Sequence, residues 1–176
     1  PTKQPAEILT IANHILGTGQ LSLAKFLFIT ADDTNQLYAQ NVEKYLQYIF
    51  ERIDLTRDLH FHTNTTIDTL DYSGIGLNSG SKLVLAAYGE KKRELCREVP
   101  QAFKELNGFA NAQLCMPGVV ALQTKQFSTY EEAAKEMDVY QLSTINYQLN
   151  SVVQIIICDD ASFTSANLRN YLWVSY

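Results

Sequence analysis

Cysteine is scarce in this sequence. The chain has 176 residues and three cysteines, Cys96, Cys115 and Cys158, which are odd in number and far apart. This pattern argues against a disulfide framework and against a CxxC metal site, so we expect a reducing, cytoplasmic environment. Long apolar runs are also missing: none approaches the roughly 20 residues that a membrane-spanning helix needs.

Positive charge is in the minority. Lys and Arg total 14 against 19 Asp and Glu, a formal charge of −5, which argues against broad contact with nucleic acid or anionic lipid. Hydrophobic residues make up 46% and charged residues 19%, a globular composition that excludes a disordered chain. The length suits one domain, and we predict a single α/β domain over residues 1–176.

Predicted strands alternate with predicted helices along the chain. Nearly continuous apolar runs predict strands buried on both faces at residues 24–31, 82–88 and 152–158. Residues 57–63 alternate between Leu59/Phe61 and His60/His62, which predicts a more exposed strand. Helical spacing predicts helices at 5–16, about 37–51, 129–137 and from 165 onward. The order predicts a three-layer α/β/α fold with a mainly parallel or mixed sheet.

Two strand–Asp-Asp–helix segments resemble each other. Residues 26–33 align with 153–160, and residues 41–50 align with 167–176 after a one-residue deletion. We interpret the segments 24–58 and 152–176 as an internal repeat whose strands lie parallel in one sheet; chance similarity is the alternative. The second copy stops at Tyr176 within an apolar helical face, so we expect that the chain was cut from a longer protein.

The acidic pairs Asp32/Asp33 and Asp159/Asp160 directly follow predicted strands. Carboxylates at the carboxyl ends of strands can hold Mg²⁺ or take part in phosphate chemistry. They also cap the helices that follow, and capping is the interpretation we favour because no third ligand is recognisable.

Other motifs carry little chemistry. His60 and His62 share one face of a strand and could ligate a metal, but a solvated strand face is the simpler interpretation. The stretch at residues 17–20 lacks GxGxxG spacing, and the loop at 72–81 lacks the ending of a phosphate-binding loop. We assign no catalytic, cofactor-binding or metal-binding residue.

Four segments taken together resemble the carboxy-terminal part of the UbiD family of decarboxylases. In order they are KFLFITADD at 25–33, ERIDLTRD at 51–58, NTTIDTLD at 64–71 and GSKLVLAA at 80–87. The family pattern has a third Asp where Thr34 stands and a Pro where Leu55 stands, which suggests a divergent subfamily.

The resemblance implies a domain of an enzyme that uses prenylated FMN and a divalent metal to decarboxylate an aromatic or α,β-unsaturated acid. No position here matches the family's catalytic set, so we expect no cofactor in this fragment and no activity from it alone. The implied role is assembly and lining of the substrate pocket. Ile67 and Leu70 are the best candidates for the pocket wall and Gly19 and Gln20 are weaker ones, whereas ordinary core packing is the alternative for Ile67 and Leu70.

The resemblance also implies partners. They are the flavin-binding remainder of the parent chain and further copies in a homo-oligomer, in quinone synthesis or in aromatic-acid breakdown. A different interpretation is a stand-alone regulatory or ligand-binding module that uses the acidic strand ends. A third is a structural dimerisation domain with Tyr171, Trp173 and Tyr176 at its surface.

Overall fold

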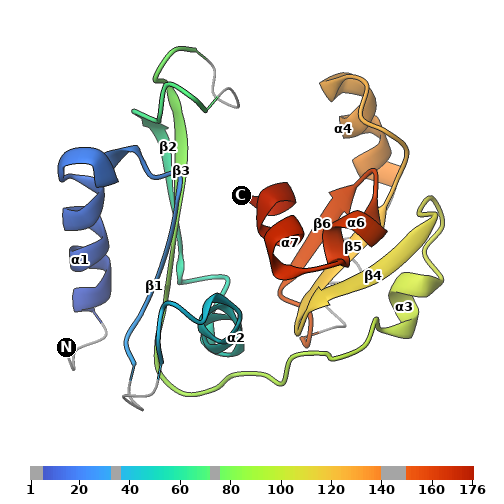
Figure 1. Cartoon of the computed structure of the whole chain (residues 1–176), viewed down its shortest axis with the longest axis horizontal. Helices are drawn as coiled ribbons and strands as arrows, with labels where there is room; N and C mark the ends of the chain where they lie inside the picture. Colours follow the sequence, from blue (N-terminus) through green and yellow to red (C-terminus); the bar gives the residue numbers. More distant parts are fainter. Residues whose placement is uncertain (1–5, 33–36, 72–75, 140–149) are drawn as a thin grey trace. The chain divides into compact units, whose positions relative to one another are not determined.

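The computed structural model describes residues 6–32, 37–71, 76–139 and 150–176, except for the side chains of 136–139. The chain divides into two compact units, Pro1–Lys92 and Arg93–Tyr176, and each contains a three-stranded mixed sheet flanked by helices (Figure 1). This is an α/β fold, as the sequence predicts. The predicted single domain, three-layer arrangement and internal repeat stay predictions. No described helix is both long and apolar enough to span a membrane.

The first unit contains six elements. They are α1 (Glu7–Leu16), the 3-10 helix η1 (Gly19–Leu23), β1 (Phe26–Thr30), α2 (Val42–Arg52), β2 (Leu59–Thr65) and β3 (Gly80–Ala87). The strand order is β1-β3-β2. β1 runs parallel to β3, with Phe26 opposite Leu83, and β2 runs antiparallel to β3, with Leu59 opposite Leu85. The helix predicted at about 37–51 begins later, at Val42.

Strand β3 is central in its sheet and β1 is an outer strand. Val84 and Ala86 of β3 pack against Ile8 and Ala12 of α1 in a fully buried cluster. Every residue of β1 is only half-buried, because the strand has a single neighbour in the sheet. The prediction that this run is buried on both faces is therefore wrong for β1, although it is a strand. An apolar run alone does not distinguish a central from an outer strand.

The second unit contains seven elements. They are α3 (Gln101–Lys104), β4 (Asn111–Met116), β5 (Val119–Gln123), α4 (Tyr130–Val139), β6 (Gln154–Cys158), α6 (Ala161–Ser165) and α7 (Leu168–Ser175). The strand order is β4-β5-β6, with β4 antiparallel and β6 parallel to β5. The predicted strand at 152–158 is thus β6, and it lies in a different sheet from β1. The expectation that both strands of the repeat share one sheet is wrong.

A tight turn joins β4 to β5. Gly118 has a φ of +80°, which a side chain rarely adopts, and a Cβ on it would lie 2.7 Å from Cδ2 of Leu95. The backbone conformation therefore favours glycine here, and a Cβ would also require the Leu95 side chain to shift. The turn starts the most buried strand of the unit, since Val119, Val120, Ala121 and Leu122 are all fully buried.

Candidate functional site

All four candidate pocket residues lie on segments at one edge of the first sheet, where β1 begins and β2 ends. Gly19 and Gln20 lie in η1, which leads into the start of β1, and Ile67 and Leu70 follow the end of β2 (Figure 1). Because β1 is parallel and β2 antiparallel to β3, the start of β1 and the end of β2 meet at the same edge. Segments far apart in the sequence are thereby brought together.

Two polar contacts hold these segments at the edge. Lys25 and Asp71 form an ion pair with an N–O distance of 3.0 Å, which joins the segment after β2 to the start of β1. Lys82 of β3 donates from Nζ to the carbonyl oxygen of Ser22 in η1. Lys82 is buried, and this burial lowers its pKa. These contacts link the segment after β2 and η1 to strands β1 and β3.

The two apolar candidates differ in exposure. Ile67 is 1% exposed and belongs to the core, and its backbone N–H donates to the carbonyl of Asn78 at 3.4 Å. Leu70 is 76% exposed. In the structure of this chain Ile67 therefore packs as a core residue, whereas Leu70 presents its side chain to solvent. Alternation along the sequence gives no signal that separates them, since both follow the same strand.

The structure adds two leucines that the sequence reasoning missed. Leu21 in η1 is 58% exposed, and Leu77, just before β3, is 82% exposed. With Leu70 they form what we call the apolar edge: three exposed leucines on segments that meet where β1 and β3 begin. Gly19 lies in the same segment as Leu21 and has a φ of +51°.

A charged network lies at the opposite edge, where α2 connects to β2. Asp58 is 1% exposed, and its carboxylate accepts hydrogen bonds from Arg57 Nε at 2.5 Å and from the backbone N–H of Asp54 at 2.8 Å. The Arg57 guanidinium lies 4.2 Å over the ring of Tyr88. Lys92 contacts Asp54 at 2.6 Å and lowers the pKa of that carboxyl. These groups satisfy one another, so the network fixes the connection between α2 and β2.

The acidic pairs are divided between capping and other contacts. Asp160 caps α6 by accepting the N–H of Phe163 at 2.8 Å, as predicted. Asp32 instead accepts the N–H of Leu37 at 2.9 Å, and α2 is capped by Asn41 because the helix begins at Val42. The prediction that Asp32 caps this helix is wrong. Asp33 lies outside the described residues.

His60 and His62 lie on the half-buried face of β2, so the prediction that they lie on a solvated face is wrong. The exposed face is the opposite one. Phe61 is 66% exposed, whereas His60 and His62 are half-buried opposite Val84 and Lys82 of β3. Across the described residues, no three His, Cys, Asp or Glu side chains gather to hold a metal ion.

Comparison with known proteins identifies a family for the first half of the chain. Residues 2–87 match the model of the 3-octaprenyl-4-hydroxybenzoate carboxy-lyase C-terminal domain. An uncharacterised protein of Chlamydia caviae is 32% identical over 97% of this chain, and one of Chlamydia trachomatis is 30% identical over 97%. A Chlamydia pneumoniae protein, named as a subunit of 4-hydroxybenzoate decarboxylase, is 31% identical, again over 97%.

The similarity to the chlamydial proteins covers both units, whereas the family model stops at the end of β3. The chain spans 27% of the length of each of these relatives. The four motif segments at 25–33, 51–58, 64–71 and 80–87 all fall within the matched residues 2–87. Residues 2–87, and through them the first unit, therefore belong to the UbiD family as its carboxy-terminal domain.

Proposed function

We propose that this chain is an assembly and substrate-pocket-lining part of a longer, UbiD-like decarboxylase that acts on aromatic or α,β-unsaturated carboxylic acids. The observation that carries the proposal is the match of residues 2–87 to the family's carboxy-terminal domain. The name of the Chlamydia pneumoniae relative, which is that of a 4-hydroxybenzoate decarboxylase subunit, agrees with it. The chain's share of its relatives' length leaves room for a separate catalytic part.

The cofactor of the proposed enzyme, prenylated FMN with a divalent metal, would serve as the electron sink for decarboxylation. The described residues do not fit the metal, because none of their carboxylates, histidines or cysteines form a group of three. We therefore place the cofactor on the rest of the longer protein and derive no step through it in this chain. The proposed homo-oligomer is a further part of the same proposal.

The apolar edge is the surface through which this chain would act. Covering a leucine side chain completely is worth about 1.5–3 kcal/mol, so Leu21, Leu70 and Leu77 together offer a strong reason for the edge to be covered. Against a flat aromatic substrate, leucine side chains exclude water and contribute no charge. Against a neighbouring protomer, they form the apolar centre of a contact.

The experiment compares leucines on and off the apolar edge in the full-length decarboxylase. Leu70→Ser and Leu77→Ser change exposed residues of the edge, and Leu55→Ser is the matched control, because Leu55 is also 47% exposed but lies between α2 and β2. We expect both edge variants, and not the control, to raise KM about tenfold or to weaken association between protomers. Decarboxylation assays and light scattering after gel filtration give the two readouts.

Two outcomes would contradict the proposal. If neither edge variant differs from Leu55→Ser in KM, kcat or mass, the edge has no role in pocket or assembly. If the 176-residue chain alone decarboxylates substrate, the catalytic set lies within it, contrary to our assignment.

A further inference from the structure

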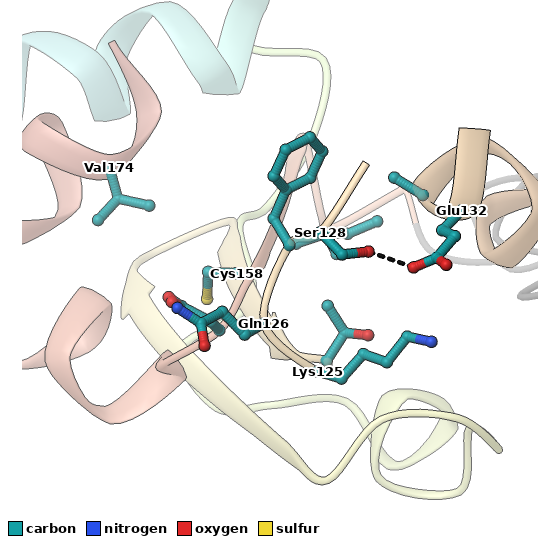
Figure 2. Close-up of a pocket in the computed structure, with 11 residues that line it drawn as sticks. Lys125, Gln126, Ser128, Glu132, Cys158 and Val174 are labelled. Carbon is teal, nitrogen blue, oxygen red and sulfur yellow. Dashed lines mark hydrogen bonds between the residues drawn. The ribbon is translucent and has the colours of Figure 1, made fainter. Parts of the chain in front are cut away.

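A pocket opens in the second unit, outside the family match. It has a volume of about 420 Å³ and lies where β5 and β6 end (Figure 2). Residues 124–128 after β5, the start of α4, residues 157–159 at the end of β6, and Val174 of α7 line it. The carboxyl ends of neighbouring parallel strands are the usual place for ligands in α/β sheets, and this volume suits a small molecule.

The interior of the pocket is mainly apolar. Phe127, Ala133, Ile157 and Val174 contribute carbon surface. Phe127 stands edge-to-face with Tyr130 at a centroid distance of 5.3 Å. Cys158 is 8% exposed, and burial raises the pKa of its thiol, so this side chain stays uncharged at neutral pH. An apolar group is therefore the chemistry that the interior favours.

The charged groups of the pocket favour a cation. Two carboxylates, Glu132 and Asp159, line it against one ammonium group, that of Lys125, which leaves one net negative charge. Ser128 donates its hydroxyl to the Glu132 carboxylate, as Figure 2 shows. This balance attracts an ammonium group and repels a carboxylate.

We propose that this pocket binds a small arylalkylamine, with the ring among the apolar side chains and the ammonium group near Asp159 and Glu132. The proposed substrates of the longer enzyme are carboxylic acids and carry the opposite charge. The pocket shares no residue with the apolar edge, and its test does not depend on decarboxylation.

The test uses two probes that share a phenylethyl group and carry opposite charges. Phenethylamine carries an aromatic ring and an ammonium group, and 3-phenylpropionate carries the same ring and a carboxylate. Each is titrated into the isotope-labelled 176-residue chain while backbone amide resonances are recorded. We expect phenethylamine to shift the resonances of residues 124–128 and 157–159 saturably, and 3-phenylpropionate to bind at least about tenfold more weakly.

Three variants locate the binding. Asp159→Asn removes one carboxylate and should weaken phenethylamine binding about five- to tenfold. Glu98→Gln makes the same charge change at an exposed position outside the pocket and should leave the affinity within about twofold of the unmodified chain. Ala133→Phe fills the pocket and should abolish binding of both probes.

The proposal is overturned by any of three results: no saturable shift with phenethylamine, binding of 3-phenylpropionate as tight as that of the amine, or equal effects of Asp159→Asn and Glu98→Gln. Asp159 is exposed, so its variant remains informative even if Ala133→Phe disturbs the fold.

Discussion

Asn41 and Asn167 make the same capping contact in the two units. Asn41 caps α2 by accepting the N–H of Lys44 at 3.2 Å, and Asn167 caps α7 by accepting the N–H of Asn170 at 3.0 Å. These two residues also stand opposite each other in the alignment of 41–50 with 167–176. The two aligned segments thus share a capping contact, although the repeat itself stays a prediction.

Replacing either capping asparagine should destabilise the chain. Asn41→Ala and Asn167→Ala each leave a first-turn N–H without its side-chain acceptor, and we expect a loss of about 1 kcal/mol in the free energy of unfolding. Urea denaturation measures this loss. The matched control is Asn107→Ala, which changes an exposed asparagine in a turn and should cost less than about 0.5 kcal/mol. Equal losses in all three variants would contradict the capping roles.

Removing the buried carboxylate of Asp58 should lower the free energy of unfolding more than removing a capping asparagine does. Asp58→Asn breaks the ion pair with Arg57 and weakens the acceptor for the N–H of Asp54. Because the Arg57 side chain is 44% exposed and water can solvate it, we expect a loss of about 2–3 kcal/mol. The free energy of unfolding, measured in urea, gives the value.

Asp68→Asn is the matched control for this change. Asp68 also accepts a backbone N–H, that of Leu70 at 2.8 Å, but in an exposed turn. A loss below about 1 kcal/mol is expected there. If the two variants were equally stable, the charged network would have no structural role.

The hydroxyl of Tyr171 should stabilise the second unit. Tyr171 is fully buried, so the prediction that it lies at the surface is wrong. Its hydroxyl donates to Oε1 of Gln154 at 2.7 Å, beside the Tyr176 hydroxyl at 3.2 Å. Tyr171→Phe keeps the ring and removes this bond, so we expect a loss of about 1 kcal/mol. Tyr130→Phe, at a side chain that is 83% exposed, should be neutral, and a similar loss in both variants would argue against the buried bond.

Stability should fall at alkaline pH. Burial, followed by the nearby Cys158, raises the pKa of the Cys115 thiol from its ordinary 9.0 to about 11. The folded chain therefore keeps a proton that the unfolded chain loses. This contribution is fully present below about pH 9 and is lost as the pH rises to about 11.

Cys115→Ala separates the effect of this thiol on stability from that of Tyr171 and Tyr176, whose pKa values are also raised by burial. We expect the free energy of unfolding to fall by about 1–2 kcal/mol less between pH 9 and 11 in the variant than in the unmodified chain. Urea denaturation across this range measures both slopes, and parallel slopes would contradict the assignment.

Replacing the two apolar pocket candidates of the first unit, Ile67 and Leu70, should change the free energy of unfolding by different amounts. Ile67→Ala removes a core side chain that is 1% exposed and should cost about 2–4 kcal/mol. Leu70→Ala changes a side chain that is 76% exposed and should stay within about 0.5 kcal/mol. Thermal or urea unfolding decides this, and similar losses for both would show that Leu70 also packs in the core.

Much of the local structure follows from the sequence. The apolar runs at 24–31, 82–88 and 152–158 are strands β1, β3 and β6. The order of four short segments was enough to indicate the family, because each segment keeps its composition and its place along the chain. These features are local, and periodicity and capping are local properties of a sequence.

Tertiary structure decided which strands are central, which side chains are exposed and which segments lie side by side. β1 is half-buried because it has one neighbour, and Leu70 and Ile67 differ in exposure although they stand only three positions apart. The segments before β1 and after β2 lie at the same end of the sheet only because of the strand directions. The pocket lined by residues 124–128 and 157–159 depends on which strands end side by side. Strand pairing is a long-range choice, set by how whole elements pack, so no single segment of the sequence encodes it.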